Sequence, residues 1–368
     1  ELKNVVKYFE LAKKFAANEN QVKMLECYEK HFMYGDINDH KESQKYWVHD
    51  KNPVVETNMG FIEHYRNSIR SEFQSFVAMV DKEKTKQFSL LVNNAEKFLA
   101  MLPYPKEFEK DEFIAPDFTS LNVLTFASTG MPSGIHLSNY HDVTDKYGSK
   151  CVYLGNVIEA SFSTKNGELP KYLTHEDGKV YNKYVKRGFK VDVGGHEMIG
   201  HQSGKMFSET KHVNNSTGEI TMTYNFDRNM LNPITNNVVE TWYKEGETYG
   251  SVFGSIGSGY EESRAEATGL LLNCVHDMHM IFGHSDDEWK DISYIAWLWM
   301  IRSGVLGLSA YDDKNNKWLQ AHCQARYAIY RVLKEAGIVE ITYTNNSFLI
   351  TVNRSEIETK GLSALREY

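Results

Sequence analysis

The chain has 368 residues, of which 41% are hydrophobic, 24% charged and 13% aromatic. This composition excludes a disordered or collagen-like protein, because so many aromatic residues can bury enough apolar surface to offset the entropy of folding. The net charge of -8 and the lack of a long basic run exclude a typical nucleic-acid-binding protein. The length predicts two or three structural units.

Targeting signals are not evident in the sequence. The longest uncharged apolar run, residues 292–301, has about half the roughly 20 residues that a membrane span needs, so a buried helix is expected there. Charges interrupt residues 1–20, which argues against a signal peptide. The cysteines are far apart and form no Cys-x-x-Cys pair, which predicts reduced thiols in a cytoplasmic protein; they are Cys27, Cys151, Cys274 and Cys323.

The first third of the chain is predicted to be mainly helical. Residues 1–33 have apolar side chains at helical spacing, and a polar loop is expected at 35–44. Residues 61–101 are interpreted as one or two further helices, which end before Pro103 and Pro105.

The rest of the chain adds strands to this helical pattern. Short β-type runs at 121–126 and 151–158 flank a loop at 128–140 that is rich in Gly, Pro, Ser and Asn. A polar loop follows at 165–179, and residues 339–352 alternate around Asn345-Asn346 as in a β-hairpin. Helices are predicted at 191–207, 261–282, 291–308 and 317–336. We therefore expect a predominantly helical α+β protein with a β-containing insert near 120–162.

The hexapeptide His-Glu-Met-Ile-Gly-His at residues 196–201 is the most informative segment. Two imidazoles beside a carboxylate can supply two zinc ligands and a base for catalysis. The histidines are five residues apart, so on an ideal helix their side chains diverge by about 140°. They converge only if one residue is looped out in a π-turn, which Gly200 could absorb. The alternative is two histidines that lie near a glutamate by chance.

A third ligand has to come from elsewhere in the chain. Glu262 and Glu266 are four residues apart at the start of an apolar segment and share a helical face, while Glu261 points elsewhere. One carboxylate could bind a metal while a neighbour hydrogen-bonds a ligand imidazole. The alternative is an acidic first turn that complements the helix dipole, with Arg264 as an ion-pair partner.

Together, His-Glu-x-x-Gly-His and Glu-Glu-x-Arg-Ala-Glu resemble the motifs of the dipeptidyl peptidase III family, which are cytosolic zinc exopeptidases. Further segments resemble the family in the same order; they lie at residues 60–66, 116–121, 154–157 and 320–326. The resemblance implies one Zn²⁺ per chain, held by His196, His201 and Glu262. It makes Glu197 the general base for a zinc-bound water.

The same resemblance assigns the residues around the metal. Glu261 and Glu266 would hydrogen-bond the ligand imidazoles from behind. Tyr65 and His322 would donate to the oxyanion, and Arg326 would contact the C-terminal side of the peptide. Glu63 and Asn139 would hold the free α-ammonium. Without the resemblance, Tyr65 and His322 would be interpreted as ordinary half-buried residues and Glu63 as a solvated helix charge.

Some positions depart from the family pattern. Ser263 stands where many members have Cys, His136 where Asn is expected, and Tyr249-Gly250 where an aromatic residue and Asp are expected. A second amine-binding carboxylate is expected near Phe73, where Glu72 and Gln74 are both candidates.

The resemblance implies a helical zinc lobe that faces a β-containing lower lobe across a cleft. Residues 1–80 and 120–165 would belong to the lower lobe, and residues 81–119 and 166–368 to the zinc lobe. Family members are about twice as long, so the lower lobe is expected to be incomplete in this chain.

The sequence thus predicts a cytoplasmic, monomeric zinc-dependent dipeptidyl peptidase that acts on oligopeptides, without nucleic-acid or membrane partners. An alternative from another class is a catalytically silent, zinc-containing peptide-binding module or fragment. A third interpretation, a peptidase that removes single residues, is disfavoured by the five-residue histidine spacing.

Overall fold

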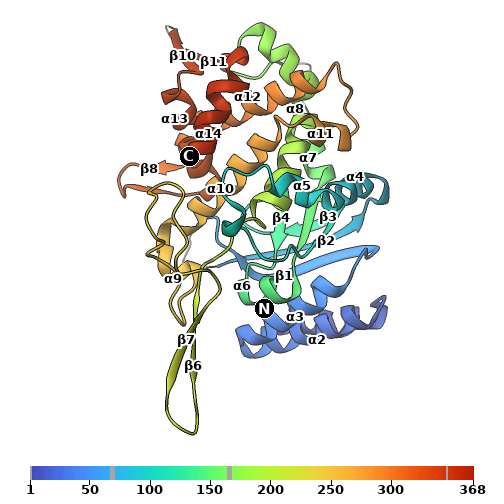
Figure 1. The fold of residues 1–368 in the computed structure, drawn as a ribbon. Helices are drawn as coiled ribbons and strands as arrows, with labels where there is room; N and C mark the ends of the chain where they lie inside the picture. The colour runs from blue at the N-terminus through green and yellow to red at the C-terminus, as the bar shows by residue number, and fades with distance from the viewer. Residues whose placement is uncertain (1, 67–70, 164–167, 345–346) are drawn as a thin grey trace.

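The computed structural model describes residues 2–66, 71–163, 168–344 and 347–368. A group of N-terminal helices lies at one end, a five-stranded sheet lies in the middle, and a larger group of helices lies at the other end (Figure 1). The predicted class, a predominantly helical α+β fold, is confirmed.

The N-terminal helices are α1 (Leu2–Ala12), α2 (Glu19–Tyr34) and α3 (Ile37–His49). The prediction of a loop at 35–44 is wrong, because α3 begins within this segment. Asp36 caps this helix by accepting a hydrogen bond from the Asn38 amide at 2.8 Å. The helix escaped the sequence analysis because much of its buried face is polar; His40, Ser43 and Gln44 are all nearly inaccessible to solvent.

The central sheet has the strand order β1-β2-β3-β5-β4. Its strands are β1 (Val55–Glu63), β2 (Glu72–Val80), β3 (Asp117–Ala127), β4 (Gly134–Leu137) and β5 (Lys150–Leu154). The helical interpretation of 61–101 is therefore wrong before residue 81, although α4 (Lys82–Asn93) and α5 (Ala95–Leu99) follow. Phe76 and Ala78 are buried two residues apart, which is strand periodicity, but aromatic residues at longer spacing suggested a helix.

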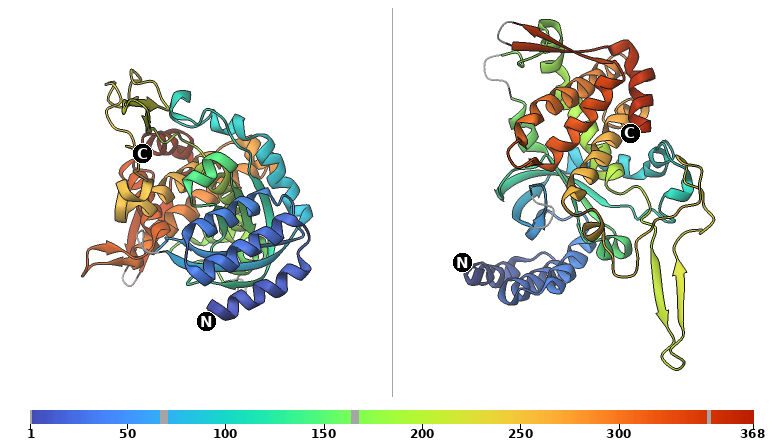
Figure 2. Two further views of the ribbon diagram at one scale, coloured as in Figure 1. Left: turned by 90° about the horizontal axis from the view of Figure 1, so that it is seen from below. Right: turned by 90° about the vertical axis from the view of Figure 1, so that its left-hand side faces the viewer.

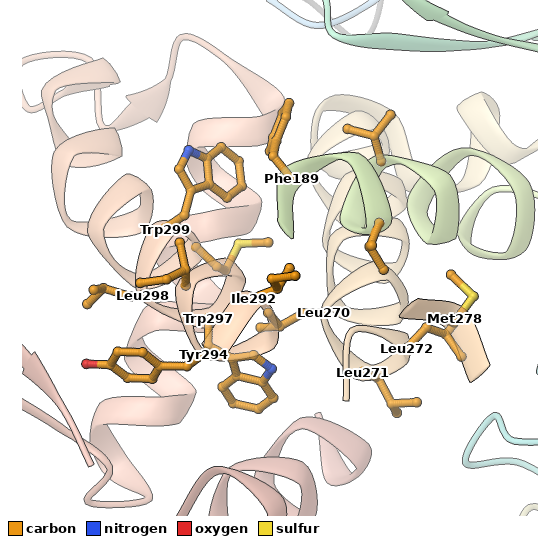
Figure 3. Packing of buried hydrophobic residues seen from close by; sticks show 14 of the residues in the cluster. Phe189, Leu270, Leu271, Leu272, Met278, Ile292, Tyr294, Trp297, Leu298 and Trp299 are labelled. Carbon is orange, nitrogen blue, oxygen red and sulfur yellow. The ribbon is translucent and has the colours of Figure 1, made fainter. Parts of the chain in front are cut away.

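Strand β5 separates two hydrophobic cores. Its residues Cys151 and Tyr153 face the larger core, while Val152 and Leu154 face the smaller one. This alternation follows from the two-residue period of a strand whose faces are both covered. The smaller core joins α1–α3 to the sheet, and the larger core lies among the helices of the second half (Figure 3). The division of the chain into two lobes with boundaries at 80, 119 and 165 remains a prediction.

Helix α12 (Trp289–Gly307) is the centre of the larger core, where Trp297 is completely buried. With its C-terminal extension to Ala310, it is the one helix among the described residues that is long and apolar enough to cross a membrane. Two-thirds of its most apolar window is buried inside the protein, which is typical of a core helix.

Of the remaining α-helices that the structure describes, three lie at the segments expected to be helical at 261–282 and 317–336, one reaches the segment expected at 191–207 only with its last residues, and four were not predicted. The remaining α-helices are α6 (His141–Tyr147), α7 (Gly155–Ser161), α8 (His175–Gly195), α9 (Tyr249–Phe253), α10 (Gly257–Leu272), α11 (His276–Ile281), α13 (Ala321–Glu335) and α14 (Leu362–Glu367). Short helical turns also occur; they are η1 (Lys13–Phe15), η2 (Lys106–Phe108), η4 (His196–Gly200), η5 (Gly254–Ile256), η6 (Leu308–Ala310), η7 (Arg354–Glu356) and η8 (Ile357–Gly361).

Several expected boundaries need correction. The loop at 128–140 contains β4, and the run at 151–158 changes from strand to helix α7. The loop at 165–179, partly outside the described residues, ends where Thr174 caps α8. The helix expected at 191–207 ends at residue 200, and the one at 261–282 breaks between α10 and α11. Because caps and tight turns depend on single side chains, periodicity places such boundaries only approximately.

Within the described part of the chain, three two-stranded antiparallel sheets lie outside the central sheet. Strands β10 (Val339–Thr344) and β11 (Ser347–Val352) confirm the C-terminal hairpin, whose Asn345-Asn346 turn lies outside the described residues. Strand β9 (Lys317–Trp318), which pairs with β8 (Tyr311–Asp312), occupies the start of the segment expected to be helical at 317–336, so the helix begins only at Ala321. Strands β6 (Glu209–Val213) and β7 (Ile220–Tyr224) were not predicted; they form a hairpin that projects from the body with no fully buried residue (Figure 2).

His40 connects α3 to the sheet and to the segment that carries Asn139. Its Nε2 donates to the Met59 carbonyl at 3.0 Å, so its Nδ1 must accept from the Tyr140 hydroxyl at 2.9 Å. Burial lowers the pKa of His40 to about 4. The neutral imidazole is therefore part of the folded structure.

Stability is expected to fall as the pH drops from 6.5 towards 4. In this range the unfolded chain protonates His40, whose ordinary pKa is about 6.5, while the folded chain does not. This residue alone should cost about 1–2 kcal/mol of unfolding free energy between pH 7 and pH 5. Urea unfolding should show a smaller pH-dependent loss for His40→Gln than for the natural chain. His175→Gln, at an exposed position, is the matched control; an equal loss in all three proteins would contradict the prediction.

Candidate metal centre

The two histidines of the hexapeptide are brought together by a π-turn. Helix α8 continues into η4 (His196–Gly200), whose closing hydrogen bond joins the His201 amide to the His196 carbonyl at 3.0 Å. The extra residue in this turn puts both imidazoles on one side, with their Nε2 atoms 3.1 Å apart. The predicted looped-out turn near residue 200 is confirmed.

Glycine is required at position 200 because helix α10 passes directly against the turn. A Cβ atom at Gly200 would lie 2.7 Å from the Ala265 Cα atom, which is backbone and cannot move aside cheaply. This close approach brings Glu262, one turn earlier on α10, to the two histidines. Glycine thus permits both the π-turn and the helix contact.

The three predicted ligand atoms fit around one divalent ion. The Glu262 Oε2 atom lies 3.3 Å from the His196 Nε2 atom and 3.9 Å from the His201 Nε2 atom. Tetrahedral zinc, with bonds of about 2.0–2.2 Å, keeps its ligand atoms about 3.4 Å apart. Moreover, the buried Glu262 Oε2 atom has no hydrogen-bond partner among the described residues. A bound cation would supply the missing partner.

Two further carboxylates lie near the other ring nitrogens of the imidazoles, and one of them is within hydrogen-bond distance. Glu261 Oε1 lies 2.8 Å from His201 Nδ1, as predicted for a group that fixes the tautomer of a metal ligand. Burial alone would raise the pKa of Glu261, but Arg264 and His201 outweigh it and lower the pKa. Glu266 lies 3.8 Å from His196 Nδ1, which is beyond hydrogen-bond distance, so this half of the arrangement is looser.

The charge balance of the cluster also favours a cation. Burial opposes a charge on His201, yet the adjacent carboxylates, Glu261 first, raise its pKa to about 9. A site that binds an extra proton this strongly has an excess of negative charge. A metal ion replaces that proton when it binds.

Glu197 points into the same cluster and is only 5% exposed. Burial, reinforced by Glu262 and other carboxylates, raises its pKa to about 8 although His201 opposes the shift. Strand β4 lies against this carboxylate: a Cβ atom on Gly134 would approach Glu197 Oε1 to 2.4 Å. The Cys151 thiol donates to the Glu197 carbonyl at 3.4 Å, a contact that nothing in the sequence signalled. Glu197 is therefore fixed between β4, β5 and α8.

Tyr65 and His322 come from opposite ends of the chain and meet beside the cluster. Their ring centroids are 5.1 Å apart, and the Ala321 amide donates to the Tyr65 carbonyl at 2.7 Å. His322 Nδ1 lies 3.1 Å from Glu262 Oε2, so His322 forms a second possible three-ligand set with His196 and Glu262.

A cavity of about 230 Å³ opens next to these rings. Its walls include Tyr65, Glu197, His322 and Arg326, together with the loop before β4. Arg326 is held there by Glu266, which accepts from its Nε atom at 2.6 Å. The predicted base, oxyanion donors and C-terminal contact therefore share one cavity.

Glu63 and Asn139 lie together but do not line this cavity. The Asn139 amide donates to the Ile62 carbonyl at 2.8 Å and to Glu63 Oε2 at 3.4 Å. Gln74, 1% exposed, donates to the other Glu63 oxygen at 3.2 Å. Burial, followed by the charge of Glu262, raises the pKa of Glu63 to about 7, because its partners are neutral.

This arrangement decides between the two residues near Phe73. Glu72 turns away from Glu63 and accepts a hydrogen bond from the Arg66 amide at 3.1 Å, whereas Gln74 faces Glu63. The sequence alone could not separate them because Glu72 and Gln74 lie on the same face of a strand. The second expected carboxylate is therefore absent from this position, and a carboxamide stands there.

The remaining departures occupy distinct places. The His136 ring stacks on His201 with centroids 5.5 Å apart, and burial lowers its pKa well below the ordinary value. Ser263 donates to the Gly259 carbonyl at 2.8 Å within its own helix. Gly250 has open space around it. Of the three, only His136 changes the immediate surroundings of the predicted ligands.

The chain matches the family model of peptidase family M49 over residues 1–368. The chain belongs to peptidase family M49. It is 43% identical to dipeptidyl peptidase 3 of Nematostella vectensis over 99% of its own length and 50% of that protein, and 42% identical to the human dipeptidyl peptidase 3, again over half of it. This M49 chain therefore spans about half the length of the curated relatives it matches.

Two solved structures share the fold of this M49 chain. The match to the dipeptidyl-peptidase III of Corallococcus sp. strain EGB has a TM-score of 0.71 at 18% identity. It covers all of this chain and 60% of the Corallococcus chain. The enzyme from Caldithrix abyssi matches with a TM-score of 0.67 at 19% identity over 61% of its chain. The resemblance read from the motifs is confirmed, while the roles of individual residues remain predictions.

Proposed function

We propose that this chain is a zinc-dependent dipeptidyl peptidase that releases dipeptides from the N-termini of oligopeptides. The observation that carries the proposal is the convergence of His196, His201 and Glu262 on one point beside the buried carboxylate of Glu197. Membership of family M49 and the similarity to proteins named dipeptidyl peptidase 3 support it.

The three ligand atoms would hold one zinc ion, with Glu261 and Glu266 behind the imidazoles. The chemistry supplied by zinc held there would be activation of a water molecule and polarisation of the scissile carbonyl. Glu197 takes a proton from the attacking water and passes it to the leaving amine. Burial and neighbouring carboxylates raise the pKa of Glu197, whereas a nearby cation lowers it, so the charged base is favoured once the site is loaded.

Tyr65 and His322 would stabilise the oxyanion that forms when the carbonyl is attacked. Both are donors held on separate elements, so little reorganisation accompanies the reaction. The Ala321–Tyr65 backbone bond fixes their mutual position. Arg326, at the far wall of the cavity, would contact the peptide beyond the cleaved bond.

The Glu63 carboxylate would select for a free N-terminus. It is desolvated, and its hydrogen-bond partners are the neutral side chains of Asn139, Gln74 and Tyr65, so it lacks a counter-charge. A substrate α-ammonium supplies that charge, with Asn139 completing its hydrogen bonds. A chain with a blocked N-terminus would leave the carboxylate unpaired, which is strongly disfavoured.

The test compares Arg-Arg-naphthylamide, Arg-naphthylamide and N-acetyl-Arg-Arg-naphthylamide after the zinc content of the full chain has been measured. We expect one zinc per chain and cleavage of the first substrate alone. Cleavage of only the single-residue substrate would identify an aminopeptidase instead. Bound zinc without any cleavage would identify the silent peptide-binding module.

The remaining proposals concern the setting of the enzyme. We propose a cytoplasmic monomer, supported by four cysteines that are all free thiols. We also propose that the two hydrophobic cores correspond to the lower and the zinc lobes. Oligopeptides would be the partners, with no role for nucleic acid or membrane.

A further inference from the structure

Arg264 holds the carbonyl end of the π-turn. Its Nη1 atom donates to the Gly200 carbonyl at 2.5 Å, to the Ser203 carbonyl at 2.9 Å and to the Ser203 hydroxyl at 3.0 Å. Its Nη2 atom lies 3.4 Å from the His201 carbonyl. The last carbonyls of a helix have no partner within the helix, and a guanidinium is well suited to satisfy several of them. One side chain thus ties down the turn that brings the two histidines together.

The other edge of the same guanidinium donates hydrogen bonds to Glu261. The Arg264 Nη2 atom lies 2.7 Å from Glu261 Oε1, and its Nε atom lies 3.2 Å from Glu261 Oε2. This is a two-point contact that fixes the plane of the carboxylate. Because Glu261 Oε1 in turn lies 2.8 Å from His201 Nδ1, the orientation of the imidazole depends on Arg264.

The arrangement behind His196 is less rigid. There Arg326 binds Glu266 at 2.6 Å through its Nε atom, and the second Glu266 oxygen lies 3.8 Å from His196 Nδ1. Nothing comparable ties Arg326 to the backbone of the π-turn among the described hydrogen bonds. His196 lies at the start of the turn and follows directly from α8, whereas His201 lies beyond the irregular residue. His201 is therefore the ligand that regular helix geometry constrains least, and it is the one whose orientation depends on Arg264.

We infer that Arg264 is a positioning residue that fixes His201 in its metal-binding orientation, both through Glu261 and through the backbone of the π-turn. The inference rests on the proposed metal site. Arg264 itself touches neither the ligand atoms nor the cavity. A lysine cannot replace it, because an ammonium lacks the planar set of donors that reaches the carboxylate and the carbonyls at once.

The experiment measures zinc affinity by competition with a chelator for the natural chain, Arg264→Lys and Arg264→Met. We expect the zinc dissociation constant to rise about 10- to 100-fold in Arg264→Met, which is typical of the loss of a partner behind a metal ligand. Arg264→Lys should lose nearly as much, although it keeps the charge. At saturating zinc, KM for Arg-Arg-naphthylamide should change little, because the peptide contacts are intact.

A matched control separates positioning from general stability. Arg187 lies on α8 and makes an ion pair of the same two-point type with Glu288, at 3.1 Å for both contacts, away from the metal cluster. Arg187→Met should leave zinc affinity unchanged. Thermal unfolding of the metal-free proteins shows whether Arg264→Met is folded. If it is not, the zinc affinity of Arg264→Lys tests the inference.

A double-variant cycle tests the route through Glu261. Because Arg264 acts partly through this carboxylate, Glu261→Gln and Arg264→Met together should weaken zinc binding less than the product of their separate effects. An unchanged zinc affinity in both Arg264 variants, or an equal loss in Arg187→Met, would overturn the inference. If the natural chain binds no zinc, the proposed function fails instead.

Discussion

Glu197→Gln is expected to bind zinc normally and to lose about 10²- to 10⁴-fold in kcat, the usual contribution of a general base. The substitution keeps the size of the side chain, so it fits between β4 and α8, where a Gly134 Cβ atom would already collide with the carboxylate. It removes the group that takes the proton but leaves all three predicted ligands in place. The loss should therefore appear in kcat and not in zinc affinity.

The measurement is hydrolysis of Arg-Arg-naphthylamide at saturating zinc, together with a chelator competition. Glu176→Gln, on an exposed residue in the first turn of the same helix, is the control and should retain full activity. A near-normal kcat for Glu197→Gln would show that the proton acceptor lies elsewhere. A parallel loss of zinc would instead place Glu197 among the ligands, which its proximity to His196 and His201 makes a direct geometric alternative.

The sequence could predict the metal cluster because most of its information is local. Glu197 and both histidines lie within six residues, and their five-residue spacing itself required a bulged turn that only a small residue could permit. Glu262 needed a second motif about sixty residues later. The sequence could not show why the two motifs meet, since that depends on the close packing of Gly200 against the Ala265 backbone.

Helix α3 and strand β1 were missed because their buried faces are partly polar. Pattern reading assumes that buried positions are apolar, but α3 buries His40 and Gln44, and β1 buries Asn58. These polar groups are acceptable inside only because partners from other elements satisfy them; the Asn58 amide, for example, donates to Gln44 at 2.9 Å. Such pairs are separated along the chain, so no local window can reveal them.

The predicted amine-binding group also depends on contacts between strands that the local sequence does not reveal. The family resemblance predicts a second carboxylate near Phe73, and the sequence left open whether Glu72 or Gln74 occupies its position. Glu63 pairs with Glu72 across the sheet, with a bulge between Phe61 and Glu63, yet the side chain that bonds the Glu63 carboxylate is Gln74. Glu72 and Gln74 share one face of β2, so only the position of each side chain in the folded protein separates them.

His201→Ala is expected to lose zinc and, with it, peptidase activity. The free energy of zinc binding in small proteins, about 10–16 kcal/mol, is shared by four ligands, so removing one should weaken affinity roughly 10²- to 10³-fold. The loss should be visible as zinc content of the purified protein and in chelator competition. His212→Ala, which removes an exposed imidazole on β6, should keep both zinc and activity.

His322→Ala decides whether His201 or His322 completes the ligand set with His196 and Glu262. His322 Nδ1 lies closer to Glu262 Oε2, at 3.1 Å, than His201 Nε2 does, at 3.9 Å. If His322 is an oxyanion donor, its removal should keep zinc and lower kcat by about 10²- to 10³-fold. If it is a ligand, zinc should be lost from His322→Ala and retained by His201→Ala. We expect the first result. The other ring nitrogen of His201 has a carboxylate partner, Glu261, as is typical of a metal-binding imidazole. The Nδ1 atom of His322 instead faces Glu262 and Glu266 without a hydrogen bond to either.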